Sequence, residues 1–136
     1  MSKTIGIVGT RKRKSLSDFQ ACEKVFLSIY EEGDRIVSGG CPDGGDNFAE
    51  KIAKKFGITI TIHYPNWKKH GKSAGFLRNG AIAEEADILI AVVDPSRKGG
   101  TEDTIKKMDK FGKKNKVILV EEVKEYLDDE DIFGKP

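Results

Sequence analysis

The sequence has few of the residues that mark specialised protein classes. Its 136 residues include two cysteines, four prolines and one tryptophan, and no apolar run approaches membrane-spanning length. The cysteines, Cys22 and Cys41, are too few for a disulfide framework and lack the spacing of a zinc site. Met1 to Lys3 run directly into a strand without a signal peptide. The sequence therefore predicts no metal site, no resident cofactor, no membrane partner and a cytoplasmic location.

The composition is that of one ordinary globular domain. Hydrophobic residues make up 38% of the chain and charged residues 34%, with a net charge of only +2. A chain of this length is near the commonest domain size and can bury a core. The sequence leaves open whether copies of the chain form a homo-oligomer.

Strand and helix patterns alternate along the chain. Strands are predicted at 4–8, 35–38, 58–63, 87–93 and 116–120, and helices at 17–32, 47–56, 74–85 and 101–111. Such alternation predicts a single Rossmann-like three-layer α/β domain with a mainly parallel sheet of about five strands. The domain is expected to span 1–121, and 122–136 to form an acidic, partly helical tail. A basic, aromatic loop is expected at 64–73.

Three glycine-containing turns follow predicted strands. Gly9 follows the first strand, Gly39 and Gly40 the second, and Gly99 and Gly100 the fourth. Parallel strands end at one edge of their sheet, where open α/β folds bind ligands. Glycines at strand-to-helix turns let a ligand approach the backbone, and the free N–H groups of the first helical turn suit a phosphate. The turns therefore predict one shared phosphate-binding site.

Two familiar nucleotide motifs are absent. Gly71-Lys72-Ser73 resembles the end of a P-loop, but that pattern needs a glycine five positions before Gly71, where Asn66 stands. The first strand ends in Gly6-Ile7-Val8-Gly9, which is not the GxGxxG fingerprint. Neither a classical NTPase nor a classical dehydrogenase is supported.

Several short motifs are spread from Lys3 to Val120. They are Gly9-Thr10-Arg11, Ser38-Gly39-Gly40 with Gly44-Gly45-Asp46 and Ala49, the block from Pro65 to Gly75, Arg78-Asn79, Ala86-Asp87 and Gly99-Gly100-Thr101. Together they resemble the SLOG superfamily, and within it the YspA-type (cpYpsA-related) branch. The superfamily also includes the LOG phosphoribohydrolases and the DNA-processing protein DprA. The resemblance implies a Rossmann-like sheet and a pocket for a nucleotide or nucleotide-derived ligand.

The resemblance also bears on catalysis. In LOG enzymes an arginine on the helix before the fourth strand and a glutamate in a PGGxGTxxE motif serve hydrolysis of an N-glycosidic bond. Arg78 matches the arginine, but Thr104 stands at the glutamate position and the proline is absent. The nearby carboxylates are Glu102 and Asp103. The candidate catalytic residues are thus Arg78, Glu102 and Asp103, and the displaced carboxylate favours binding over hydrolysis.

The predicted ligand-binding residues come from the turns and from the resemblance. They are Gly9, Thr10, Arg11, Ser38, Gly39, Gly40, Asp46, Trp67, Arg78, Asn79, Gly99, Gly100 and Thr101. Some have plainer roles: Asp46 fits a helix N-cap, and Arg11 lies in a basic run of the kind that is usually solvated. Trp67 could stack on a base or cover the core.

Basic side chains are expected near the ligand edge, at 11–14 and 68–72, while acidic ones crowd the tail. The sequence pI of 8.4 lies below the range typical of nucleic-acid binders, and alternating aromatic platforms are lacking. The sequence therefore predicts binding or sensing of a nucleotide or nucleotide-derived metabolite, such as a nucleoside monophosphate or an ADP-ribose-like molecule. A phosphoribohydrolase is the alternative, and nucleic-acid binding ranks third.

Overall fold

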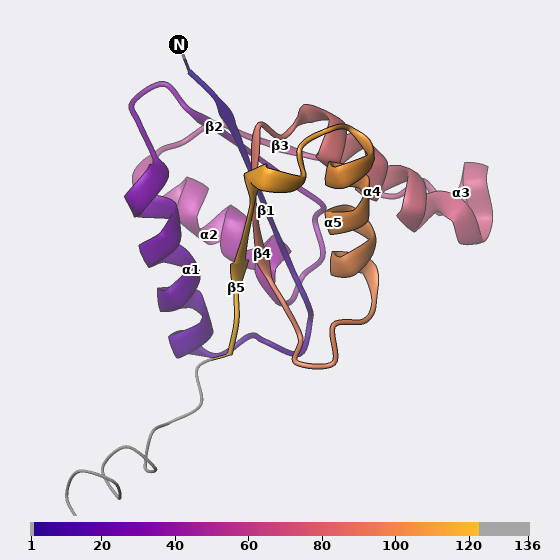
Figure 1. The fold of residues 1–136 in the computed structure, drawn as a ribbon, viewed down its shortest axis with the longest axis horizontal. Coiled ribbons are helices and arrows are strands. Elements are labelled where there is room, and N and C mark those ends of the chain that lie inside the picture. The colour runs from indigo at the N-terminus through magenta and orange to yellow at the C-terminus, as the bar shows by residue number, and fades with distance from the viewer. Residues whose placement is uncertain (1, 123–136) are drawn as a thin grey trace, which may run out of the picture.

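The computed structural model describes residues 2–122, in which strands and helices alternate (Figure 1). The strands are β1 (Thr4–Gly9), β2 (Arg35–Ser38), β3 (Ile60–Ile62), β4 (Ile88–Val92) and β5 (Val117–Val120). The α-helices are α1 (Leu16–Ile29), α2 (Gly45–Phe56), α3 (Trp67–His70), α4 (Ala74–Glu85) and α5 (Gly100–Lys110), with short 3₁₀ turns η1 (Gly71–Ser73) and η2 (Lys114–Lys116). All strand pairs are parallel, in the order β3-β2-β1-β4-β5. The predicted single Rossmann-like α/β fold is confirmed. The predicted tail, apart from Glu122, lies outside the described residues.

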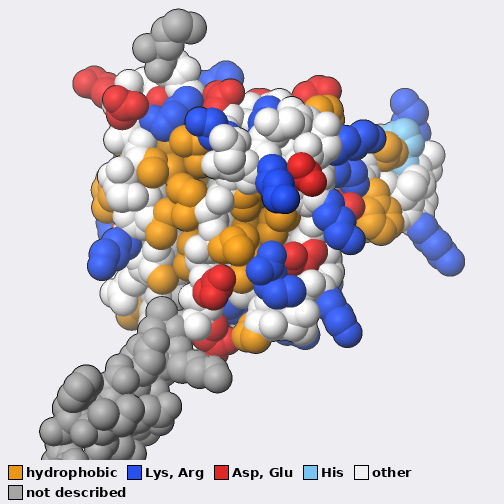
Figure 2. Space-filling model, viewed as in Figure 1, with side chains coloured by type: hydrophobic (Ala, Val, Ile, Leu, Met, Phe, Trp, Pro, Cys, Tyr) orange, Lys and Arg blue, Asp and Glu red, His pale blue; other side chains and the backbone are white. Residues whose placement is uncertain are grey.

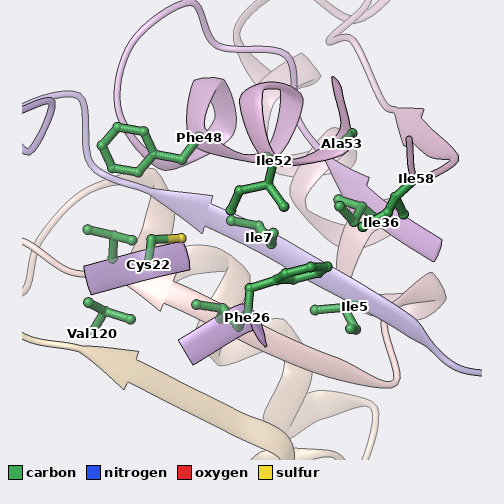
Figure 3. Close-up of a cluster of buried hydrophobic side chains, with 13 residues drawn as sticks. Ile5, Ile7, Cys22, Phe26, Ile36, Phe48, Ile52, Ala53, Ile58 and Val120 are labelled. Atoms are coloured by element: carbon green, nitrogen blue, oxygen red, sulfur yellow. The ribbon is translucent and has the colours of Figure 1, made fainter. Parts of the chain in front are cut away.

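Helices cover both faces of the sheet, so the domain has three layers. Helices α1 and α2 lie on one face, and α4 and α5 on the other (Figure 1). On the first face Phe26 and Ile52 pack against Ile5 and Ile7 of β1 (Figure 3). The second core includes Leu89 of β4 with side chains of α4 and α5. Because both faces are covered, the central strands are apolar along nearly their whole length.

The first helix begins close to its expected position and ends early. Ser15 is the N-cap and forms a capping box with Asp18, so the helix starts one residue before the predicted position 17. The helix ends at Ile29, three residues before its predicted end at position 32. Tyr30 is extended and stacks on Phe26, with ring centroids 5.2 Å apart. The early end of the helix thus coincides with an aromatic contact between its C-cap residue and its last turn.

The expectation that Asp46 caps the second helix is wrong. Gly44 is the N-cap, and Asp46 is the second residue of α2. The helix starts early because Gly45 packs directly on β1, where an added Cβ would lie 2.4 Å from the carbonyl oxygen of Val8. At the other end Gly57 adopts the left-handed conformation and closes the helix after Phe56, where the predicted helix also ends.

The segment between β3 and α4 differs most from the prediction. Strand β3 is limited to 60–62, and the expected loop at 64–73 contains α3 and η1. Asn66 caps α3 by accepting a hydrogen bond from the Lys69 N–H at 3.1 Å. Helix α3 projects from the body of the domain (Figure 1).

None of the helices in residues 2–122 has the length and apolar character needed to cross a membrane.

Candidate functional site

A cavity of about 1090 Å³ lies at the carboxyl ends of the parallel strands. Its walls come from the carboxyl ends of four strands and the segments after them. The lining residues there are 8–12 at the end of β1, 39–42 after β2, Tyr64, Pro65 and Trp67 after β3, and Asp94, Ser96 and 98–101 after β4. Helix α4 adds Arg78, Asn79 and Ile82. The volume is at the upper end of the range for small-molecule sites, and this edge is where open α/β sheets bind ligands.

Most of the predicted ligand-binding residues lie together around this cavity. Those in its wall are Gly9, Thr10, Arg11, Gly39, Gly40, Asp46, Trp67, Arg78, Asn79, Gly99, Gly100 and Thr101. Ser38 is the exception, because it is buried and its hydroxyl donates to the carbonyl of Ile7. That these residues contact a ligand stays a prediction.

The sequence reasoning missed several wall residues. Tyr64 and Pro65 follow β3, while Asp94 and Lys98 follow β4. A parallel sheet collects its strand ends at one edge, and this signal covers all four residues. Tyr64 and Pro65 lie in a turn without glycine, whereas Asp94 and Lys98 precede the glycines of the turn after β4.

The turn after β4 presents an open helix N-terminus to the cavity. Gly99, with φ +105, is the N-cap of α5, and no side chain caps this end. Thr101, the second residue of α5, is only 9% exposed and lines the cavity beside this end. Unpaired N–H groups and the helix dipole make such an end suited to an anion.

The turn after β2 is occupied by charged groups of the protein itself. Arg78 donates from Nη1 to the carbonyl oxygen of Gly39 at 2.6 Å. Asp46 Oδ2 accepts from the Cys41 N–H at 3.1 Å and lies 4.0 Å from Arg78 Nη1. Burial raises the pKa of Asp46, an effect that the Cys41 amide and the Arg78 guanidinium partly offset. This end of α2 therefore already holds a carboxyl group.

Two adjacent residues of α4 connect the two turns. Besides its bond to Gly39, Arg78 donates from Nε to Asn79 Oδ1 at 2.9 Å. Asn79 in turn donates from Nδ2 to the carbonyl oxygen of Gly100 at 3.3 Å and to Asp103 at 3.0 Å. The Arg78-Asn79 pair thus sets the position of both glycine turns.

Positive charge gathers where β1 and β4 end. Arg11, Lys12 and Lys98 line the cavity there, together with the carboxylate of Asp94. Lys12 Nζ lies 3.4 Å from Asp94, and the Ser96 hydroxyl and this ammonium group hold the pKa of Asp94 below its usual value. Three cations beside one carboxylate favour an anionic ligand group.

Arg13 does not belong to the solvated basic run that the sequence suggested. It is 5% exposed and donates to the carbonyl oxygens of Val93 and Val120 and to Asp18. Its guanidinium satisfies the backbone where β4 and β5 end and braces the start of α1. Arg13 is therefore a structural residue, and only its neighbours Arg11 and Lys12 line the cavity.

The second basic segment lies outside the cavity wall. Lys68 and Lys69 are on α3 and Lys72 is on η1, all exposed to solvent. Basic side chains surround this projecting part in Figure 2. The expectation that these lysines lie at the ligand edge is therefore wrong, because α3 carries them outward while Trp67, at its start, stays in the wall.

The candidate catalytic carboxylates also lie outside the wall. Glu102 pairs with Arg97 through two contacts of 2.8 and 2.9 Å. Asp103 accepts from Asn79 and from Lys107, the latter at 2.6 Å. Thr104 does line the cavity, and its hydroxyl donates to the carbonyl oxygen of Gly100. Among residues 2–122 there is no group of three or more His, Cys, Asp and Glu side chains placed to hold a metal ion.

The fold and the cavity define a Rossmann-like α/β protein with a small-molecule-type cleft at the carboxyl edge of its sheet. One solved structure with this fold is that of a molybdenum cofactor binding protein from the phototrophic bacterium Rippkaea orientalis. It is 22% identical, with a TM-score of 0.64, and the match covers 98% of this chain and 83% of that one. No protein-family model matches the chain, and no curated protein matches its sequence. The likeness establishes the fold, and membership of the SLOG superfamily stays a prediction.

Proposed function

We propose that the protein binds a nucleotide or a nucleotide-derived metabolite, with its phosphate at the N-terminus of α5. The observation that carries this proposal is the uncapped turn of Gly99 and Gly100, which opens into the cavity beside Thr101. Arg11, Lys12 and Lys98 supply positive charge at the same end. Backbone N–H groups, a hydroxyl and nearby cations are the donors that a phosphate group requires.

The opposite end of the cavity is suited to a planar ring. Tyr64 and Trp67 lie there and are 66% and 59% exposed, so aromatic surface remains open to a ligand. Aromatic side chains stack on bases and other heterocycles. A ligand that combines a phosphate with a heterocycle therefore fits both ends.

The geometry supports binding in preference to hydrolysis. A phosphoribohydrolase needs a carboxylate beside the reacting sugar carbon, but Glu102 and Asp103 are held in ion pairs outside the cavity wall. We expect AMP to remain intact when incubated with the protein. Release of adenine and ribose 5-phosphate, lost in Glu102→Gln or Asp103→Asn, would contradict this expectation.

A second candidate ligand is the molybdenum cofactor, which the fold neighbour named above favours. Its phosphorylated pterin offers the same two features, an anion and a planar ring. The open α5 turn and the aromatic end fit these features, but nothing in the wall is particular to that cofactor. The molybdenum cofactor is therefore included among the ligands tested below.

The identity of the ligand is tested by mass spectrometry of the natively purified protein, followed by calorimetry with the four nucleoside 5'-monophosphates, ADP-ribose and the molybdenum cofactor. We expect a nucleotide or a nucleotide-derived metabolite to co-purify or to bind. Absence of binding by every nucleotide in the panel, with a folded protein, would overturn the proposal.

A further inference from the structure

Asp46 is a buried carboxyl group with few hydrogen bonds at the wall of the cavity. Its side chain is 9% exposed, and it accepts one backbone hydrogen bond, from Cys41 at 3.1 Å. Ser38 lies close, but its single proton goes to the carbonyl of Ile7. An ionised carboxylate has about four acceptor positions, so most of those of Asp46 are left for donors that enter the cavity.

The position of Asp46 along the cavity says which part of a ligand it meets. An added Cβ on Gly39 would lie 2.7 Å from Asp46 Oδ2, so the carboxyl group sits directly over the end of β2. In the sheet, β2 lies between β3, which leads to the aromatic end, and the β1 and β4 pair, which leads to the basic end. Neighbouring strands are about 4.8 Å apart, so these three positions are separated by short, regular steps.

We infer that Asp46 accepts hydrogen bonds from the sugar hydroxyls of the bound nucleotide and so selects ribonucleotides over deoxynucleotides. The inference rests on the proposed function, because a phosphate at α5 and a base at Tyr64 and Trp67 leave the sugar at the end of β2. A carboxylate accepts hydrogen bonds but cannot donate them, so it pairs with hydroxyls. It also repels a second phosphate at this position.

The other carboxyl group in the wall is less suited to this role. Asp94 already accepts from the Ser96 hydroxyl and from Lys12 Nζ, and it follows β4, at the basic end. The protein therefore already supplies two donors to Asp94, both to Oδ2, whereas Asp46 accepts one hydrogen bond. Arg78, next to Asp46, uses two of its five N–H donors on Asn79 and Gly39, which leaves donors for the oxygen atoms of a ligand.

The test compares one nucleotide with its hydroxyl-deficient forms. Calorimetry first selects the nucleoside 5'-monophosphate that binds most tightly. Its 2',3'-dideoxy form and its 3'-phosphorylated form are then titrated into the wild-type protein, Asp46→Asn and Glu50→Gln. Glu50 lies one turn further along α2 and outside the cavity wall, so Glu50→Gln removes a nearby negative charge without touching the site.

Because hydrogen bonds to a charged group are strong, removing the sugar hydroxyls should lower the affinity for the nucleotide about tenfold to a hundredfold. We expect this loss in the wild-type protein and in Glu50→Gln. In Asp46→Asn the affinities for the parent and the dideoxy nucleotide should differ by less than about threefold. The 3'-phosphorylated form should bind the wild-type protein at least tenfold more weakly than the parent and gain affinity in Asp46→Asn.

Equal affinity of the wild-type protein for the parent and dideoxy nucleotides would overturn the role of Asp46 while leaving the proposed function in place. This arm needs no variant, so it holds even if Asp46→Asn does not fold. A hydroxyl preference that persists in folded Asp46→Asn would also overturn the inference. Failure of every nucleotide to bind the folded wild-type protein would overturn both the inference and the proposed function.

Discussion

In the turn after β2, side chains of the protein fill the space beside the glycines, whereas in the turn after β4 that space is open. An added Cβ on Gly39 would lie 2.7 Å from both Arg78 Nη1 and Asp46 Oδ2. On Gly40 it would lie 2.5 Å from the ring of Tyr64. An added Cβ on Gly99 would have no atom of residues 2–122 within 4 Å apart from its chain neighbours. For Gly100, outside its neighbours and the backbone of α5, the nearest atom of these residues is Asn79 Nδ2 at 3.8 Å.

The difference teaches that two glycine turns at the same sheet edge serve different purposes. In the first, the absence of side chains allows close packing of Asp46, Arg78 and Tyr64 against the backbone. In the second, it leaves an uncapped helix end accessible from the cavity. The first turn is therefore expected to govern stability and selectivity, and the second to govern affinity for the anion.

The largest expected effect is a loss of stability when the turn between β2 and α2 is changed. In Gly44→Ala the new Cβ would lie 2.1 Å from the carbonyl oxygen of Thr10, at a φ of +74. Because the neighbour is backbone, the clash adds to the strain, and we expect a loss of about 3 kcal/mol or more. Urea unfolding measures it. Gly100→Ala is the matched control, expected to change stability by less than about 0.5 kcal/mol. Similar losses in both variants would remove the contrast between the turns.

The next effect is on ligand affinity in the second turn. Gly100→Val places a branched side chain at the open helix end while the fold is retained, since only Asn79 lies near. Because a phosphate would then lose its approach to the backbone N–H groups, we expect affinity for the tightest nucleotide to fall about a hundredfold or more. Calorimetry with circular dichroism as the folding control decides the outcome. Unchanged affinity in a folded variant would exclude this turn from the site.

A smaller effect separates the cavity from the projecting α3. Arg78 lines the cavity, and Lys69 does not. We expect Arg78→Ala to weaken nucleotide binding about tenfold and Lys69→Ala to leave it within about twofold. Binding should also depend only weakly on salt, because few counterions are released. A steep salt dependence with strong, sequence-independent DNA binding, reduced in Lys69→Ala, would favour nucleic acid as the partner instead.

The smallest expected effect concerns Asp46 in the free protein. Burial raises its pKa above the ordinary value of 3.8, so its protonated form favours the folded state at low pH. This contribution is lost as the pH rises through the raised pKa. The stability of Asp46→Asn relative to wild type should therefore increase as the pH rises above 3.8 and then level off. Urea unfolding across this range tests it, and a difference that falls with rising pH would contradict the assignment.

The fold was predictable because its signals are local. Strands β1 and β4 are identified by their apolar runs, and the end of α2 is marked by Gly57. These signals depend only on neighbouring residues in the sequence. Helix α3 was missed because a four-residue helix has no periodicity to detect. The burial of Arg13 was missed because its partners, the carbonyls of Val93 and Val120, are far away in the chain.

By itself the sequence determined a parallel α/β sheet with glycine turns at its carboxyl edge, since alternation and turn chemistry are properties of neighbouring residues. The tertiary structure alone decided which turn stays open. Arg78 and Asp46 reach the first turn from two different helices, and Arg97 and Lys107 hold Glu102 and Asp103 in ion pairs away from the cavity. Such contacts depend on how α2, α4 and α5 pack on the sheet, and a single sequence carries no local signal for that packing.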